Sequence, residues 1–390
     1  MIVLALCVWW ASLGMVLRFG GWGGVAVFSI VVLPMPLWAA TVERFVRGRI
    51  SDRTFGVVIA LGIAALAVVL LVIYPQINTS AMGTGSDDDD ALNIAARALL
   101  SGTYPYSEPT YLGNPVAPLP GAVLLAIPLV GLMGSSAYQA LLWIPLFILV
   151  IRFATRDAGL TLLVAALTFV PSLAVVQSIA SGTSGFVNGI YVALLSLAVV
   201  RFVPDESTPA WHRVAWTALW GISLSSRAMY APIAVLVLVA WQLRTGWAYA
   251  LRYGAVASMA GLAITLPFYI YSPDGFTPIH TGDKLTIYGA ISPVVGLAMF
   301  AVSTLAGVVM LRRKPDITRF FHASTIAVGI PVFALSLIYI ALHPTDTLGI
   351  GGFSSYMLEV LPFAVLYVGF SIGGGCSRTG DTSPLDVSRL

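Results

Sequence analysis

Four consecutive aspartates, Asp87 to Asp90, are the residues in this sequence that are best suited to chemistry. Only 9% of the 390 residues are charged, and these four stand among 17 acidic residues in all. Carboxylates that lie close together repel one another, which raises their pKa values. We therefore expect the run to act as an acid/base group or a metal-binding group of an enzyme at the outer face of a membrane.

A short amphipathic helix is expected directly after the aspartates. Leu92, Ala96 and Leu99 follow the i, i+4, i+7 spacing of one apolar stripe, and Gly102 ends the pattern. Such a helix would lie on the membrane surface. Because a helix dipole stabilises negative charge at the N-terminus, the alternative is that the aspartates only cap and solubilise this helix.

The elements that must position these residues are membrane-spanning helices. Hydrophobic residues make up 58% of the chain, and its mean hydropathy is +0.91. Repeated apolar runs of about 17–22 residues match the thickness of a bilayer. The expected fold is therefore all-α, a polytopic transmembrane bundle, and the N-terminal run is interpreted as a retained span. A net charge of +3 gives no support for a nucleic-acid partner, and Cys7 and Cys376 are expected to be plain apolar residues.

Basic residues set the predicted topology. The loop 41–55 carries four arginines and is expected to be cytoplasmic. The run 56–74 then leads outward to a long outer loop, 75–118. The short apolar stretches 119–133 and 137–151 are expected to form one descent together. Further crossings are predicted at 158–176, 187–203, 213–226, 228–243, 253–271, 291–311, 320–342 and 355–373.

With two spans before Arg44, this map gives about 12 crossings of the plasma (inner) membrane and places both termini in the cytoplasm. Three parts of the chain are distinguished on this basis. They are a two-span extension with its basic loop (1–55), the transmembrane catalytic region (56–374) and a cytoplasmic tail (375–390).

Arg227 departs from the positive-inside pattern, since it falls at a predicted outer turn. A charge near the membrane is costly and usually functional. Paired N–H groups of an arginine suit a lipid phosphate. The alternative is that the topology is shifted by one hairpin and Arg227 is cytoplasmic.

Other outer loops supply further polar candidates. His280 or Lys284 could neutralise a phosphate leaving group, and His343 beside Asp346 is a weaker candidate. The segment 101–121 is rich in Pro, Tyr and Gly, which favours a stiff loop with exposed aromatic faces. Its tyrosines, Tyr104, Tyr106 and Tyr111, could stack on a sugar or anchor the loop at the interface.

A small, glycine-rich stretch, SIASGTSGFVNG, precedes the span at 187–203. Small residues permit helices to pack closely within a membrane. This stretch therefore predicts close helix packing, and Asn188 within it could face the site.

Several motifs in order give the chain a family resemblance. The acidic outer loop opens a helix, and LLSGTYPY and YLGNPVAPLPG follow. Later come SGFVNGIYVALLSLA, GISLSSRAMYAP, LPFYIYSPDGF and YMLEVLPFAVL. Over about 75–370 the chain resembles the GT-C superfamily of polytopic glycosyltransferases. Within it, the nearest likeness is to mannosyltransferases that use polyprenol-phosphate mannose and have no soluble C-terminal domain.

The resemblance implies a polyprenyl-phosphate sugar as donor and a glycan, lipid or protein as acceptor at the extracytoplasmic face, among membrane lipids. It also implies an acidic general base in the first outer loop, for which Asp88 or Asp89 is favoured, with Asp90 as a positioning residue. The implied contacts to the donor phosphate are Arg227, Lys284 and His280. The candidates for binding acceptor or sugar are Arg97, Tyr104, Tyr106, Glu108, Asn114 and His343.

Single displacement at an anomeric carbon requires a base on one side and a stabilised leaving group on the other. Crowding and partial burial are expected to raise the pKa of the base. No metal is expected to be required, although Asp87 and Asp89 would hold Mg²⁺ or Mn²⁺ if one is used. Two alternatives stay open, namely a lipid or solute transporter or flippase, and a non-catalytic membrane assembly factor.

Overall fold

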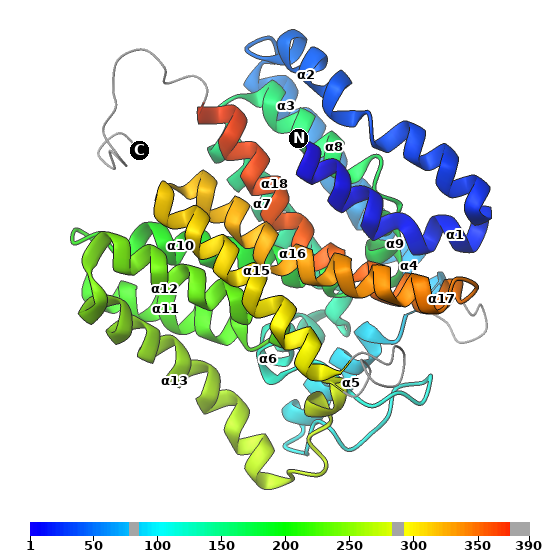
Figure 1. Ribbon diagram of the computed structural model, residues 1–390. Helices are drawn as coiled ribbons and strands as arrows, with labels where there is room; N and C mark the ends of the chain where they lie inside the picture. The colour runs from blue at the N-terminus through cyan, green and yellow to red at the C-terminus, as the bar shows by residue number, and fades with distance from the viewer. Residues whose placement is uncertain (78–85, 283–291, 375–390) are drawn as a thin grey trace.

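The computed structural model describes residues 1–77, 86–282 and 292–374, and every regular element in these ranges is helical (Figure 1). The elements are α1 (Ile2–Val32), α2 (Met35–Val46), α3 (Asp52–Val68), the π-helix η1 (Val69–Ile73), α4 (Tyr74–Ile77), α5 (Asp88–Leu100), α6 (Pro120–Met133), the 3-10 helix η3 (Ser136–Gln139), α7 (Ala140–Thr155), α8 (Ala158–Phe169), α9 (Leu173–Ser181), α10 (Gly185–Phe202), α11 (Ala210–Leu224), the 3-10 helix η4 (Ala228–Tyr230), α12 (Ala231–Thr245), α13 (Trp247–Tyr271), the 3-10 helix η5 (Thr277–Gly282), α15 (Pro293–Arg313), α16 (Ile317–Leu342), α17 (Thr347–Ser355) and α18 (Met357–Gly373).

Within these ranges, nine helical stretches are long and apolar enough to cross a membrane. A tenth is obtained if α8 and α9, which are bent by 76° at their junction, form one span. The all-helical, multi-pass architecture is thereby confirmed, whereas about 12 crossings stay a prediction. α11 occupies the predicted crossing 213–226 but has only 15 residues, and a straight span needs about 20.

α1 reverses its direction at Gly21. Twenty residues of straight helix would extend about 30 Å, yet the Trp9 Nε1 atom donates a hydrogen bond to Ser29 Oγ at 2.8 Å. The reversal is possible because Gly21 adopts φ 58° and ψ −162°, a conformation that residues with a Cβ rarely adopt. α1 is therefore a hairpin of two antiparallel helices, in agreement with the two apolar segments predicted before Arg44.

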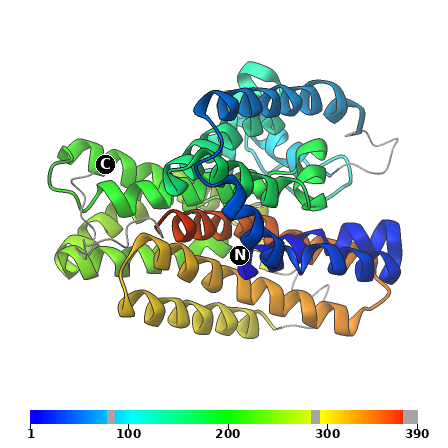
Figure 2. The ribbon, with the colours of Figure 1, turned by 90° about the horizontal axis from the view of Figure 1, so that it is seen from above.

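α18 forms the centre of the bundle. Figure 2 shows it in red, with α15 and α16 on one side and the green helices on the other. It contacts α1, α7, α8, α10 and α16. Most of its residues are buried, including Glu359. An acidic side chain therefore lies at the core of an apolar bundle.

Two glycines bring α10 against this part of α18. A Cβ atom at Gly189 would lie 2.5 Å from the backbone carbonyl oxygen of Glu359, which is closer than real contacts allow. At Gly185, one turn earlier, a Cβ would lie 3.5 Å from the Cγ atom of Glu359. Small residues four apart permit such close approach of membrane helices. The close packing predicted for this stretch is confirmed.

α5 begins where the sequence pattern predicted a helix. Asp87 is its N-cap residue, and it ends at Leu100. The side chains of Leu92 and Ala96 are buried in a smaller second core that α5 shares with α6. Because this apolar face packs against α6, a location on the membrane surface stays a prediction.

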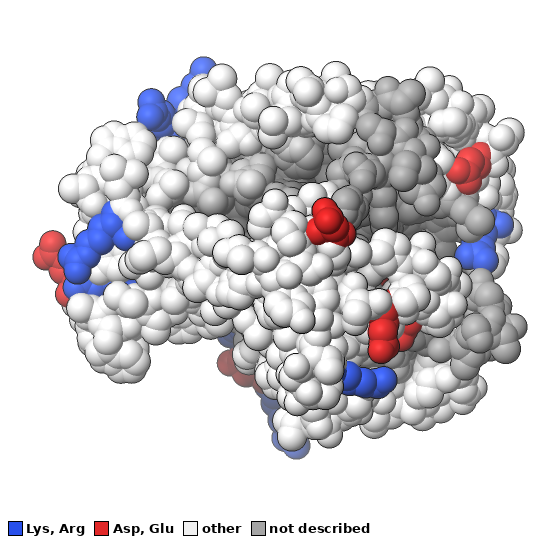
Figure 3. Space-filling model, turned by 90° about the horizontal axis from the view of Figure 1, so that it is seen from below, with Lys and Arg blue, Asp and Glu red and all other residues white. Residues whose placement is uncertain are grey.

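Charged side chains are sparse on the face of the molecule that is seen from below. Figure 3, which views the molecule from below, shows small separate groups of acidic and basic residues surrounded by uncharged atoms. Such a surface suits a protein that is largely surrounded by lipid.

Candidate active site

The four aspartates have four different sets of partners. Asp87 Oδ2 accepts hydrogen bonds from Thr110 Oγ1 and Asn114 Nδ2, both at 2.7 Å. Asp90 Oδ2 accepts one from the backbone N–H of Tyr111 at 2.9 Å. These two carboxylates therefore fix the loop that follows α5. They do not form a shared acidic cluster with their neighbours in the sequence.

Asp89 is buried in a hydrogen-bonded network behind α5. Its side chain accepts a hydrogen bond from the Tyr74 hydroxyl, and that hydroxyl lies 2.8 Å from Ser135 Oγ. Asn93, on the same side of α5, accepts a hydrogen bond from the N–H of Ser136 at 2.7 Å. Asp89 is only 1% exposed. It ties α4, α5 and η3 together and is closed to a substrate.

Asp88 points toward the middle of the bundle. Its Oδ2 atom accepts hydrogen bonds from the backbone N–H of Ser184 at 2.6 Å and from Ser184 Oγ at 2.5 Å. Its Oδ1 atom accepts one from Arg227 Nη2 at 2.8 Å. Ser184 is the N-cap residue of α10, where a helix dipole favours a negative charge. Asp88 is thus held by three donors from two other parts of the chain.

Arg227 lies between two carboxylates. Besides its ion pair with Asp88, its Nε atom lies 3.5 Å from Glu359 Oε1. The side chains of Arg227 and Asp88 are 15% and 19% exposed, whereas that of Glu359 is 3% exposed. The three residues form a charged cluster that is open at Asp88 and Arg227 and closed at Glu359.

The ion pair also restricts the topology. Because Asp88 and Arg227 touch, the aspartate loop and the turn at Arg227 lie at the same face of the membrane. Whether that face is extracytoplasmic, or cytoplasmic as in the alternative with the topology shifted by one hairpin, stays a prediction.

The surroundings of Asp88 change its acidity in the opposite direction from the one expected. Burial raises its pKa, but the positive charge of Arg227 and the hydrogen bonds from Ser184 outweigh burial and hold the pKa below its usual value. The expectation of a pKa raised by crowding is wrong for this residue, because the nearest strong influence is a cation. Burial lowers the pKa of Arg227, but the negative charges of Asp88 and Glu359 outweigh burial and raise the pKa above its usual value. This guanidinium therefore stays charged.

Glu359 is the functional candidate that the sequence analysis missed. It lay within a motif of the family resemblance but was given no role. A single acid inside an apolar span is costly and therefore informative by itself. The Oε2 atom of Glu359 and the Tyr230 hydroxyl are both buried without a hydrogen-bond partner among the described residues.

Asn188 contacts the charged cluster only through Ser184. Its Nδ2 atom is 3.2 Å from Ser184 Oγ, and its Oδ1 accepts a hydrogen bond from Tyr191 at 2.8 Å. It is 1% exposed. Asn188 therefore orients the serine that holds Asp88, and it does not line the open side.

Three predicted sugar-binding residues have partners in the protein itself. Arg97 Nη2 donates to the carbonyl of Gly134 at the end of α6, at 2.8 Å. The Tyr104 hydroxyl lies 3.3 Å from the carbonyl of Phe268 on α13. Tyr106 is buried, and its hydroxyl donates to the carbonyl of Pro118 at 3.2 Å. These contacts anchor the loop after α5, so a role in binding sugar stays a prediction.

The remaining candidates lie outside the charged cluster. Glu108 is exposed, and Asn114 is engaged with Asp87. His343 packs against the ring of Tyr339, with centroids 4.8 Å apart, beside the connection to α17. Lys284 and the side chain of His280 lie outside the part of the chain that the structure describes.

The carboxylates offer no ready metal centre. Among the described residues, no group of three or more His, Cys, Asp or Glu side chains could hold a metal ion. Asp87 accepts a hydrogen bond from Thr110 in the loop after α5, whereas Asp89 accepts one from the Tyr74 hydroxyl of α4. A divalent-metal site on these two aspartates stays a prediction, and no step below depends on one.

No protein-family model matches the chain, and searches of curated proteins and of solved structures likewise find no match. The site geometry must therefore carry the argument for function.

Proposed function

We propose that this protein is a membrane glycosyltransferase of the GT-C type. It would move a sugar, with mannose as the first choice, from a polyprenyl phosphate to a glycan, lipid or protein acceptor. The observation that carries the proposal is the contact of Asp88 with Arg227, which joins a partly exposed carboxylate to a partly exposed guanidinium. These are the base and the phosphate-binding cation that single displacement requires.

Asp88 is the proposed general base. The other three aspartates are less suited to this role, since Asp89 is buried and the carboxylates of Asp87 and Asp90 bind the loop after α5. In the reaction, Asp88 takes the proton of the acceptor hydroxyl while the hydroxyl oxygen attacks the anomeric carbon. The bond from that carbon to the phosphate oxygen breaks, and its electron pair leaves with the polyprenyl phosphate.

Arg227 is the proposed partner of the leaving phosphate. In the resting protein its charge is compensated by Asp88 and Glu359. When Asp88 accepts a proton its negative charge is lost, and the attraction between the two side chains weakens. Arg227 is then available to the phosphate when negative charge develops there. Glu359 keeps the guanidinium in place throughout, so proton transfer and leaving-group stabilisation are coupled through one ion pair.

The proposal includes a location. The site would face the extracytoplasmic side of the plasma membrane, with about 12 crossings and both termini in the cytoplasm. The exposed Ser107, in the loop that follows α5, offers a test. In a Cys7→Ser, Cys376→Ser background, Ser107→Cys should react with an impermeant maleimide in intact cells. Reaction only after permeabilisation would contradict the proposed orientation.

The activity is tested with purified protein and a synthetic polyprenyl-phosphate mannose, with release of polyprenyl phosphate as the readout. Asp88→Asn should lower turnover by about 10²-fold or more, the usual contribution of a general base. Arg227→Lys should lower it as well, because lysine lacks the paired geometry for carboxylate and phosphate. Asp90→Asn is the matched control and should stay within about threefold of the wild type. Full turnover of Asp88→Asn would remove Asp88 from the mechanism.

A transporter or flippase is the second candidate, and one observation favours it. α8 and α9 are bent by 76° at their junction, as in the broken helices of transporters. This alternative would be supported over the enzyme if the protein, reconstituted in proteoliposomes, moved a fluorescent lipid between the leaflets and transferred no sugar.

A further inference from the structure

A groove on the outside of α15 is separate from the charged cluster. It has a volume of about 520 Å³ and lies against α15 and the start of α16. Its apolar wall consists of Val302, Leu305, Ala306, Val309 and Met310. Val302 and Leu305 are 69% and 64% exposed, so this wall is open to the surroundings of the protein.

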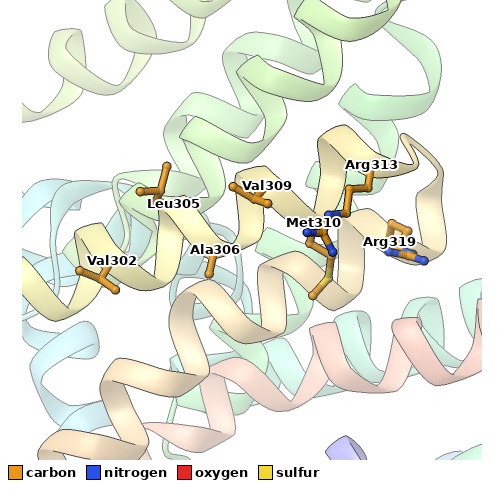
Figure 4. Close-up of a pocket in the computed structure, with 7 residues that line it drawn as sticks. All are labelled: Val302, Leu305, Ala306, Val309, Met310, Arg313 and Arg319. Carbon is orange, nitrogen blue, oxygen red and sulfur yellow. The ribbon is translucent and has the colours of Figure 1, made fainter.

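Two arginines stand at one end of the groove. Figure 4 shows Arg313 and Arg319 together at the end away from Val302. In the part of the chain that the structure describes, neither side chain has an acidic partner. The nearest acid in the sequence, Asp316, caps α16 by accepting from the N–H of Arg319 and pairs with Lys314. The groove therefore joins an apolar wall to two uncompensated positive charges.

The length of the groove matches one leaflet of a bilayer. From Val302 to Arg313 the helix rises about 16 Å, at about 1.5 Å per residue. A hydrocarbon core is about 30 Å thick, so the groove is about as long as one leaflet is deep. The basic end is also the end of α15 that lies away from α5 (Figure 1).

We propose that this groove binds an anionic phospholipid of the leaflet opposite to the charged cluster. The two guanidinium groups would hold the phosphate of the headgroup, and one acyl chain would lie along the apolar wall. Basic pockets between membrane helices bind anionic headgroups in this way. The basic end of the groove lies at the end of α15 that is away from α5, the helix that begins at Asp88 (Figure 1). A lipid bound here is therefore distinct from the proposed sugar donor, and the inference holds whether or not the protein transfers sugar.

The first test is native mass spectrometry of the purified protein with phosphatidylglycerol or phosphatidylcholine. The wild type should retain phosphatidylglycerol preferentially, and Arg313→Gln/Arg319→Gln should weaken that preference by about thirtyfold, the effect of two basic side chains near anionic lipid. The matched control is Arg53→Gln/Arg252→Gln, which removes two exposed arginines outside the groove. Unchanged retention by the groove variant would overturn the proposal, as would an equal loss in the control.

A second test uses the unaltered arginines, in case the double variant does not fold. p-Benzoylphenylalanine in place of Leu305 should crosslink phosphatidylglycerol in preference to phosphatidylcholine. The same probe in place of Val294, which is also on α15 but outside the groove, should show no preference. Equal crosslinking of both lipids at Leu305 would contradict a specific site, and so would an equal preference at Val294.

Discussion

Arginines meet the membrane in two different ways in this protein. Arg227 lies between Asp88 and Glu359, and its side chain is only 15% exposed. Arg313 and Arg319 stand at the end of an apolar groove without an acidic partner among the described residues. The first arrangement fixes a cation within a preformed network. The second leaves cations open to an anion from outside. All three residues are arginines, so the presence or absence of neighbouring carboxylates is what distinguishes the internal site from the lipid-facing one.

The largest expected effect comes from breaking the internal arrangement. Arg227→Ala would leave Glu359 and Asp88 without their cation, and the loss of one partner from a buried ion pair costs about 3–5 kcal/mol. Arg313→Ala should change the free energy of unfolding by no more than about 0.5 kcal/mol. Unfolding by denaturant in a fixed lipid–detergent mixture measures both. Similar losses for the two variants would remove the distinction between the two arginines.

The next effect concerns the packing that brings Glu359 to the cluster. Gly189→Ala places a methyl group 2.5 Å from the carbonyl oxygen of Glu359, and overpacking of this kind costs about 1–3 kcal/mol. Gly352→Ala is the matched control, since a Cβ there meets no atom within 4 Å. Thermal unfolding should separate the two variants. A harmless Gly189→Ala would show that α10 and α18 can move apart without loss.

A pH series sharpens the assignment of Asp88. Its pKa is lowered in the folded state by Arg227 and Ser184 against the opposing effect of burial. A group of this kind contributes stability that is fully present above its unfolded pKa, about 3.9, and is lost as the pH falls through the folded value. The difference in melting temperature between wild type and Asp88→Asn should therefore be constant from pH 5 to 8 and shrink below about pH 4.

The converse result is equally informative. If the advantage in melting temperature of the wild type over Asp88→Asn instead grew as the pH fell from 8 to 5, the pKa of the Asp88 carboxyl would be raised in the folded state. The ion pair with Arg227 would then not control its charge.

Part of the fold could be predicted from the sequence. Hydropathy predicted the helical, multi-pass architecture, because apolar runs of bilayer length are typical of membrane-spanning helices. It could not settle the number of crossings. α11 is too short for a straight span, and α8 and α9 bend sharply at their junction. Hydropathy measures length and polarity, whereas bends depend on the neighbouring helices.

The contact within the candidate site could not be predicted for a similar reason. Asp88 and Arg227 were each singled out, since a charge in an apolar chain is conspicuous. They are 139 residues apart, however, and their contact depends on the tertiary fold. The interpretation of Asp87 to Asp90 as one crowded cluster failed on geometry. Successive residues of a helix point about 100° apart, so neighbouring carboxylates reach different partners.

The smallest expected effect comes from Asp90, which tests whether the four aspartates really differ. Its carboxylate accepts one exposed hydrogen bond, from the N–H of Tyr111, and a bond of this kind contributes about 1 kcal/mol. Asp90→Asn retains a side-chain oxygen that can accept the same bond. We therefore expect its unfolding free energy to fall by less than about 1 kcal/mol, well below the loss for Asp88→Asn. Comparable losses for both variants would contradict the distinct roles of the four aspartates. Such a result would mean that the carboxylates stabilise the protein through their combined charge and not through separate partners.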